Sequence, residues 1–542
     1  MKLSPIPRAL RTVALGAAVS LAVFASAATI TVQSGTTVRT VDERLFGLNT
    51  AIWDQYCNTP QTISLLNSAG IRFLRYPGGS ASDEYHWKTN TSLDYTWQWA
   101  TGFDSFANLA TQTSAQVMIT ANYGTGTPEE AAEWVTYSNK TRNYGFKYWE
   151  IGNENYGTWE TDHQSRPHDP HVYATRAKEY ITQMKAADST IKVGVVVSLA
   201  SEEYAHYTDH PVTNARTGTT HNGWNPVLLA TLKSLGVTPD FVAVHRYDGA
   251  PGQESDSALL QKARTWPDDI AALRQQLTDY LGTAGANVEI LATENNSVYS
   301  NPGRQTTSLV NALYLADSVG SLLQSEAKAL MWWDLRNGQD TTNNLSSTLY
   351  GWRNYGDYGI ISTPSNGGST TAYDCYPTYY AFKLLSKFAR NGDTIVKAST
   401  DSTLLSAFAC KRTDGTLRLL VINKSPTAIQ SPTISISGFT PAATATTYSY
   451  GMIEDNNAKN GSSAVDVATG SIANASTSFS TSFEPYSITV LSFSAGTSTP
   501  TTPTTPTTPP SGGSSSSSGG GGGALPFWFV IAIAALALSR RR

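Results

Sequence analysis

Charged residues are scarce in this chain, and the charge that is present is not basic. Asp, Glu, Lys and Arg together make up 15% of the 542 residues, and the formal net charge is −4. Six of the 38 basic residues lie in 1–27 and 497–542, which hold no acid, so residues 28–496 carry 32 basic against 42 acidic side chains, a net charge of −10. A nucleic-acid binder needs a basic surface to neutralise phosphates, and a coiled coil needs many more charges. Both classes are therefore excluded.

Cysteine is also rare, with only Cys57, Cys375 and Cys410 present. So few cysteines suit an exported protein with at most one disulfide, for which Cys375–Cys410 is our guess. Their spacing does not match a zinc site, and none lies in a recognisable Cys–His context for a cysteine nucleophile. Zinc-binding and cysteine-nucleophile proteins are therefore disfavoured.

The N-terminus has the layout of a secretion signal. Three basic residues among the first eleven precede an apolar run over 13–24, and Ala-Ser-Ala at 25–27 offers small residues for cleavage. The run is short for a membrane-spanning helix, which favours a cleaved signal peptide over an uncleaved membrane anchor. We therefore expect residues 1–27 to be removed and the remaining chain to be exported.

Low-complexity sequence and an apolar run follow the body of the chain. Residues 497–523 are Thr/Pro repeats and then Ser and Gly runs, a composition that forms a linker. Residues 524–542 are an apolar segment that ends in three arginines, as a membrane anchor with a cytoplasmic end would. The order of glycine tract, apolar helix and arginine cluster resembles bacterial C-terminal sorting signals of the Gly-Gly type, which implies that a sorting protease cuts the tail. A single-pass tail anchor is the alternative, and both predict an extracellular or cell-surface protein.

The pattern over residues 43–369 predicts a catalytic barrel. Short β-branched or aromatic runs alternate there with helical patterns, as in repeated βα units. Eight strands in about 300 residues match a (β/α)8 TIM barrel. A doubly wound sheet would normally show a glycine-rich phosphate loop after its first strand, and there is none. The predicted strands are 44–49, 71–76, 116–122, 147–152, 192–198, 241–247, 289–294 and 330–335, with helices at 128–138, 171–187, 268–281 and 306–324.

Strand-like segments dominate residues 370–496, with turns at Asp414-Gly415 and around 456–461. This pattern predicts a C-terminal antiparallel β-sandwich. Residues 28–42 precede the barrel and include the strand-like run TITVQS. We expect them to add a strand to the sandwich.

Two glutamates follow predicted barrel strands. Glu154 lies in WEIGNENY after the fourth strand, and Glu294 ends the seventh strand in ATENN. Catalytic groups of a TIM barrel lie at the carboxyl ends of its strands, where these two carboxylates would face each other. Glycoside hydrolysis requires such a pair, one as proton donor and one as nucleophile or base. Either glutamate alone would more often be a surface or salt-bridged residue, and Glu150 could be an interior partner of an arginine.

Other strand ends supply groups that sugar chemistry needs. A fixed positive charge beside Glu294 would keep that carboxylate ionised, and a tyrosine hydroxyl could orient it. An amide can bind a sugar hydroxyl, and an indole at the barrel mouth can stack on a sugar ring. A buried structural histidine and core packing of one of the tryptophans are the alternatives. The candidate substrate-binding residues are Arg75, Asn153, His245, Tyr247, Trp332 and Trp333.

Four segments carry a family resemblance: FLRYPGGSASDEYHW, TANYGTGTPEEAAEWVTYSN, KYWEIGNENYGTWE and DFVAVHRYDG. They resemble the retaining α-L-arabinofuranosidases of family fifty-one, in clan A of the glycoside hydrolases, and the similarity covers roughly 29–495. The resemblance implies a double displacement with Glu154 as acid/base and Glu294 as nucleophile, without a metal or organic cofactor. It also implies that Asn153 contacts the sugar 2-hydroxyl and that Tyr247 and Arg75 attend the nucleophile.

Two positions depart from that family's pattern. The asparagine that normally follows RYPGG is Ser80 here, and the glutamate that normally lies just past strand one is missing from 47–51, GLNTA. Both residues belong to the family's furanose-binding pocket. α-L-Arabinofuranosidase therefore stays the prediction, with β-xylosidase, glucuronidase and endo-glycanase as alternatives on the same scaffold. A glycan-binding surface protein is the non-enzyme alternative.

The two roles also carry an electrostatic expectation. Glu154 is predicted to be buried beside the ionised Glu294. Burial and a neighbouring negative charge both raise the pKa of a carboxyl group. We therefore expect the pKa of Glu154 to lie above its ordinary value, as a general acid requires.

Overall fold

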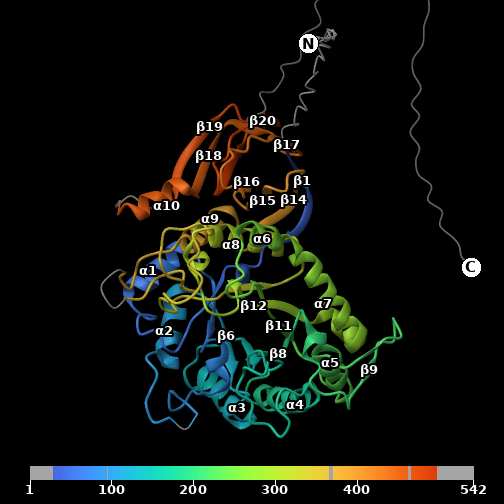
Figure 1. Ribbon diagram of the computed structural model, residues 1–542. Coiled ribbons are helices and arrows are strands. Elements are labelled where there is room, and N and C mark those ends of the chain that lie inside the picture. Colours follow the sequence, from blue (N-terminus) through green and yellow to red (C-terminus); the bar gives the residue numbers. More distant parts are fainter. Residues whose placement is uncertain (1–27, 94, 365–369, 462–464, 497–542) are drawn as a thin grey trace, which may run out of the picture. The chain divides into compact units, whose positions relative to one another are not determined.

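A computed structural model describes most of the chain (Figure 1). The predicted signal peptide, linker and apolar tail lie outside the described residues. No helix within the described part is both long and apolar enough to cross a membrane. The described residues are 28–93, 95–364, 370–461 and 465–496.

Eight parallel strands close into a barrel. Their hydrogen-bonded order is β11-β12-β13-β2-β3-β6-β7-β8, and the pairing of β8 with β11 closes the ring. Each of the eight strands predicted from the sequence overlaps one of them, and the predicted TIM barrel is confirmed. The strands are β2 (Gly47–Asn49), β3 (Phe73–Tyr76), β6 (Gln116–Ala121), β7 (Tyr148–Ile151), β8 (Lys192–Val197), β11 (Phe241–Gly249), β12 (Glu289–Val298) and β13 (Ala329–Trp332).

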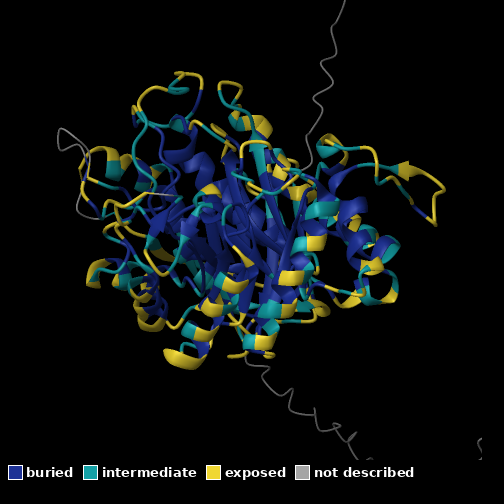
Figure 2. Cartoon of the chain, turned by 90° about the horizontal axis from the view of Figure 1, so that it is seen from below, coloured by how far each residue is buried: buried dark blue, intermediate teal, exposed yellow. Residues whose placement is uncertain are grey.

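Helices follow the strands and surround the barrel. Thr59, Thr127 and Asp169 each accept a backbone N–H in the first turn of a helix, and each is followed by proline. Such side chains satisfy a free N–H, and proline fits the first helical position because it has no N–H of its own. Figure 2 shows buried strands inside and exposed residues on the outer sides of the helices. The helices are α1 (Pro60–Ala69), α2 (Phe103–Thr113), α3 (Pro128–Thr136), α4 (Pro170–Ala187), α5 (Trp224–Ser234), α6 (Asp256–Lys262), α7 (Trp266–Leu281), α8 (Leu309–Leu322) and α9 (Pro377–Phe388).

A nine-stranded sheet makes up the second domain, in the order β19-β18-β21-β16-β15-β14-β1-β17-β20. Ile434 on β17 and Phe493 on β21 share one hydrophobic core although they lie far apart in this order. The sheet thus folds over its core, and the predicted β-sandwich is confirmed. The strands are β1 (Thr29–Thr40), β14 (Thr394–Thr400), β15 (Leu405–Lys411), β16 (Leu417–Asn423), β17 (Thr433–Ser437), β18 (Pro441–Gly451), β19 (Ala468–Ala473), β20 (Ser478–Ser480) and β21 (Ser487–Ala495).

The first strand of the chain lies in this last sheet. β1 pairs with β14 in the antiparallel sense and with β17 in the parallel sense, and Figure 1 shows it in blue among the orange strands. The sheet is therefore mixed rather than wholly antiparallel as predicted. The parallel pair arises because β1 comes from before the barrel and not from a hairpin with β17.

Helix α9 lies beyond the boundary predicted at residue 370. It packs on α1 and α8 and completes the ring of barrel helices, so the second sheet begins later, at β14.

The predicted disulfide Cys375–Cys410 is wrong, since all three cysteines are free thiols. Cys375 precedes α9 whereas Cys410 lies within β15. Four short strands lie outside the two sheets, β4 (Tyr85–His86), β5 (Thr91–Ser92), β9 (Val212–Thr213) and β10 (Thr220–His221), and helix α10 (Met452–Lys459) follows β18.

Candidate active site

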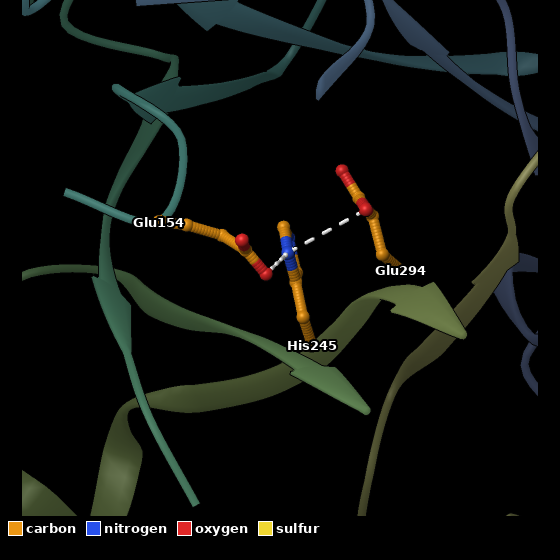
Figure 3. A group of neighbouring side chains, drawn as sticks. All are labelled: Glu154, His245 and Glu294. Atoms are coloured by element: carbon orange, nitrogen blue, oxygen red, sulfur yellow. Dashed lines mark hydrogen bonds and ion pairs between the residues drawn. The ribbon is translucent and has the colours of Figure 1, made fainter. Parts of the chain in front are cut away.

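The two glutamates predicted from the sequence meet at the carboxyl ends of the barrel strands. Glu294 lies within β12, and Glu154 lies just past the end of β7. A carboxylate oxygen of each and a ring nitrogen of His245 all lie within 4.8 Å of one another, and Figure 3 shows His245 between the two glutamates. Retaining glycosidases hold their carboxyl groups about 5–5.5 Å apart, whereas inverting ones need about 6.5–9.5 Å. Two carboxylate oxygens within 4.8 Å of each other lie below the inverting range and agree with the retaining class.

Two donors hold Glu294. Arg75 donates from Nη1 to Oε1 at 2.7 Å, and the Tyr247 hydroxyl donates to Oε2 at 2.5 Å. Arg75 is fully buried in β3 and also donates from Nε to Glu150 at 2.7 Å. Burial alone would lower the pKa of Arg75, but the charges of Glu150 and Glu294 outweigh it and raise that pKa. Arg75 therefore stays charged, with Glu150 as its interior partner.

Glu154 is held by three other donors. His245 Nδ1 lies 2.7 Å from Oε1, the Tyr156 hydroxyl donates to Oε1 at 3.1 Å, and Trp159 Nε1 donates to Oε2 at 2.9 Å. Burial raises the pKa of Glu154, but the hydrogen bond and charge of His245 and the two other donors outweigh it, so the pKa lies below its ordinary value. The expected raised pKa of Glu154 is therefore wrong. Sequence reasoning had not placed His245 against this carboxylate.

His245 carries the opposite shift. Burial lowers the pKa of its imidazole, but the nearby carboxylates of Glu294 and Glu154 outweigh burial and raise it. Its other nitrogen, Nε2, lies 3.0 Å from the Thr293 hydroxyl. The raised pKa of His245 and the lowered pKa of Glu154 together favour a proton on the imidazole beside the Glu154 carboxylate.

The turn that carries Glu154 depends on glycine. Gly152 has φ +69°, and a Cβ there would lie 2.0 Å from Asn155 Oδ1. Glu154 itself has φ +41°, in the left-handed region that non-glycine residues rarely adopt. The buried carboxyl of Asp83 secures the turn, because its Oδ2 accepts both the Asn153 N–H and Asn155 Nδ2 at 2.9 Å. Burial raises the pKa of Asp83 to about 8.

Asn153 is fixed at both ends of its amide. Its Oδ1 accepts from Arg75 Nη2 at 2.7 Å, and its Nδ2 donates to Glu160 Oε1 at 3.0 Å. This contact with Arg75 was not predicted, and the predicted contact of Asn153 with the sugar 2-hydroxyl stays a prediction. One hydrogen of Nδ2 is left over for a ligand, since an amide nitrogen carries two.

The two tryptophans at the end of β13 have different surroundings. Trp332 is fully buried and packs beside Tyr314, with ring centroids 6.0 Å apart, so its predicted role as a sugar platform is wrong and it belongs to the core. Trp333 is half-buried, and its ring meets the backbone at Gly79 and the edge of Trp53. Alternation along β13 explains the difference, because successive side chains point to opposite faces.

Sequence reasoning missed Tyr156, Trp159 and Glu160. Strand alternation ends at Ile151, where β7 ends, and the chain turns at Gly152. The direction of the next side chains therefore could not be predicted from a strand period. Their presence within the motif KYWEIGNENYGTWE was the available signal.

The cluster of Glu154, His245 and Glu294 also has donor atoms of the kind that hold a metal ion. Its surroundings do not fit a cation. The Arg75 guanidinium lies 2.7 Å from Glu294, and the raised pKa of His245 favours a second positive charge. Two like charges would oppose a metal ion there. The site fits hydrogen-bonded acid–base chemistry instead.

Comparisons with known proteins bear on this site. No protein-family model matches the chain. A probable alpha-L-arabinofuranosidase C from Aspergillus clavatus is 26% identical over 173 residues, which are 27% of this chain and 34% of that protein. The chain thus spans about a third of the length of this curated relative.

Solved structures match over nearly the whole described part. An alpha-L-arabinofuranosidase from Thermotoga maritima has a TM-score of 0.65 at 20% identity, covering 86% of this chain and 99% of that one. CelM2, a bifunctional glucanase-xylanase from a metagenome library, has a TM-score of 0.62 at 18% identity, covering 87% of this chain and 99% of that one. These likenesses confirm the fold, and the named relatives agree with the resemblance to clan A arabinofuranosidases.

Proposed function

We propose that this protein is a retaining glycoside hydrolase and that its substrate is an α-L-arabinofuranoside in a plant-type polysaccharide or oligosaccharide. The observation that carries the reaction type is the pair of carboxylates, with oxygens within 4.8 Å, at the ends of β7 and β12. The sugar is supported by the names of the similar proteins.

In the first step, Glu294 attacks the anomeric carbon and the bond to the leaving oxygen breaks. Arg75 and Tyr247 hold both oxygens of Glu294, so the carboxylate is kept ionised and oriented. The leaving oxygen takes a proton from Glu154, and His245 Nδ1 lies 2.7 Å from Glu154 Oε1 to supply it. A covalent glycosyl-enzyme and a free alcohol result.

In the second step, water replaces the enzyme at the same carbon. Glu154, now without its proton, takes a proton from the water as the new bond forms. The bond to Glu294 breaks, and the sugar leaves with its original anomeric configuration. Two inversions therefore give net retention.

Two residues that depart from the arabinofuranosidase pattern, Asn49 and Ser80, support an alternative substrate class. Asn49 occupies the region where a pocket glutamate was expected, and it is buried with its Oδ1 accepting from Arg75 at 3.0 Å. The Ser80 hydroxyl donates a hydrogen bond to Glu160. A pocket so altered supports a β-xylosidase, a glucuronidase or an endo-acting glycanase as the alternative, as does the likeness to CelM2.

The test is turnover of aryl α-L-arabinofuranoside, β-xyloside, β-glucoside and β-glucuronide, with the Glu294→Ala variant beside the wild type. We expect the arabinofuranoside to be fastest, and the variant to lose about 10³-fold or more in kcat because it has no nucleophile. Azide should restore turnover and give a product of inverted configuration. Near-wild-type activity of the variant would refute the role of Glu294, and binding without turnover of any substrate would favour a glycan-binding protein.

The sequence supports export as the setting of this activity. We propose that residues 1–27 are removed as a signal peptide and that the segment 524–542 engages the membrane or a sorting protease. Cell fractionation with N-terminal sequencing of the mature protein tests this. A cytoplasmic protein that keeps Met1 would contradict it.

A further inference from the structure

Glu160 is a buried acid that the mechanism above does not use. The residue is 4% exposed. Its Oε1 accepts from the Ser80 hydroxyl at 2.8 Å and from Asn153 Nδ2 at 3.0 Å. Its Oε2 is buried and has no hydrogen-bond partner among the described residues. Glu160 therefore joins the segment after β3 to the turn after β7, and one of its oxygens remains unused.

The surroundings of Glu160 disfavour its ionised form. Burial raises the pKa of Glu160 well above its ordinary value, and the neighbouring acids Asp83 and Glu154 raise it further. The buried Arg75 directs its ion pairs to Glu150 and Glu294. A buried carboxylate without a counter-ion and with an unpaired oxygen is strongly disfavoured. The unpartnered Oε2 is where a neutral acid would carry its proton.

We propose that Glu160 is a positioning residue, which acts as a neutral carboxylic acid to fix the amide of Asn153; this inference rests on the proposed glycosidase function. Asn153 Oδ1 accepts from Arg75, and Asn153 Nδ2 donates to Glu160. A flip of the amide would place its N–H groups against the guanidinium and its oxygen against the Glu160 oxygen, so one orientation is strongly favoured. The remaining N–H of Asn153 is thereby aimed at a sugar hydroxyl. A neutral acid achieves this without adding a third negative charge beside Glu154 and Glu294.

The first arm of the test compares Glu160→Ala and Glu160→Gln. The alanine variant frees the Asn153 amide, so we expect kcat to fall about 10- to 100-fold while KM changes less than about threefold, as for a lost positioning contact. Glutamine keeps a neutral acceptor at Oε1 and should restore kcat to within about threefold of the wild type, with an unchanged pH profile. Glu84→Gln is the matched control. Glu84 accepts a hydrogen bond from Thr161, the residue that follows Glu160 in the sequence, and it contacts neither Asn153 nor the pair of Glu154 and Glu294.

The second arm does not depend on activity. The infrared carbonyl band of protonated carboxyl groups should weaken in Glu160→Gln relative to the wild type near neutral pH, and Glu84→Gln should leave it unchanged. An unchanged band in Glu160→Gln overturns the neutral acid, and a glutamine variant as slow as alanine overturns it too. An alanine variant as active as the wild type overturns the positioning role. A wild type that turns over no glycoside refutes the proposed function instead, and the infrared result then still decides the charge of Glu160.

Discussion

The two central carboxyl groups differ in the donors that surround them. Glu294 takes bonds from the Arg75 guanidinium and the Tyr247 hydroxyl, whereas Glu154 takes its shortest bond from the His245 ring. A permanent cation favours a lasting negative charge, while an imidazole can give up its proton. These neighbours support the proposed roles of Glu294 as nucleophile and Glu154 as acid/base.

Substitution of His245 by glutamine should destabilise the fold mainly between pH 4.5 and 6.5. The lowered pKa of Glu154 contributes stability above its ordinary value of 4.5, and this is lost as the pH falls through the folded-state pKa. The raised pKa of His245 contributes stability below its ordinary value of 6.5, lost as the pH rises through the folded-state pKa. Both contributions are complete only inside this window. The expected loss is about 1–2 kcal/mol in urea unfolding, as for a charged hydrogen bond.

A surface pair provides the control for this experiment. His221 Nδ1 lies 3.0 Å from Glu202, whose side chain is 53% exposed. Solvent screens such a pair, so His221→Gln should cost well under 1 kcal/mol at any pH. A loss in His245→Gln that is the same at pH 5.5 and pH 8.5 would contradict the charged pairing.

Most of the side chains that meet at the candidate site could be predicted from the sequence, because the catalytic groups of a TIM barrel lie at the carboxyl ends of its strands. Arg75, His245, Tyr247 and Glu294 lie within the barrel strands β3, β11 and β12. Their mutual contacts could not be predicted, and the pKa of Glu154 was misjudged for that reason. A pKa depends on which donor lies within 3 Å, and that is a property of tertiary structure.

Among the elements, the turn after β7 determines the position of Glu154, the proposed acid/base. The turn needs φ +69° at Gly152 and φ +41° at Glu154, and the Asp83 carboxyl stabilises it by accepting the Asn153 N–H. Strained backbone of this kind persists only where surrounding contacts over-determine it. The position of Glu154 is therefore a product of the whole turn and not of the strand before it.

Gly152→Ala should damage both stability and catalysis. A Cβ would lie 2.0 Å from Asn155 Oδ1 and 2.9 Å from the Tyr123 Cβ, and Asn155 is held by Asp83. We expect a loss of about 2–3 kcal/mol in thermal unfolding. We also expect about a 10²-fold drop in kcat, because small displacements of a catalytic group have effects of that order.

Gly145→Ala is the matched control. Gly145 has the same φ of +69°, but a Cβ there has nothing within 4 Å. The control should lose about 1 kcal/mol from the left-handed backbone and keep its kcat. Equal effects of the two substitutions on kcat would show that the turn does not position Glu154.

The barrel strands could be predicted because each is a short β-branched or aromatic run with a helical pattern after it. Two features of these elements could not be predicted from the sequence. Helix α9 lies where strand-like sequence begins, and its partners α1 and α8 are distant in sequence. The parallel pairing of β1 with β17 joins residues about 400 positions apart, and no local pattern encodes such a partner.

At the scale of the whole molecule, helix α8 joins the barrel to the second sheet. All its residues from Leu309 to Leu322 are buried, because it contacts β12 and β13 on one side and β16 and β21 on the other. Asp317 on α8 forms an ion pair with Lys424, which follows β16, at 2.6 Å, and both side chains are at most 2% exposed. The two domains thus share a buried, charged contact.

Lys424→Met should strongly destabilise the protein. It leaves the Asp317 carboxylate buried without a counter-ion, which costs about 3–5 kcal/mol. Lys383→Met is the control, because Lys383 pairs at 2.6 Å with Asp466, which is 59% exposed, and such pairs contribute under about 1 kcal/mol. Urea unfolding of both variants measures the difference. Equal losses would argue against a structural role for the buried pair.

The anomeric configuration of the first product distinguishes a retaining from an inverting reaction. Proton NMR of a hydrolysis in progress, recorded before the free sugar mutarotates, shows which anomer is released first. If Glu294 and Glu154 act as nucleophile and acid/base at their observed spacing, the first product keeps the anomeric configuration of the substrate. Release of the inverted anomer would contradict this account.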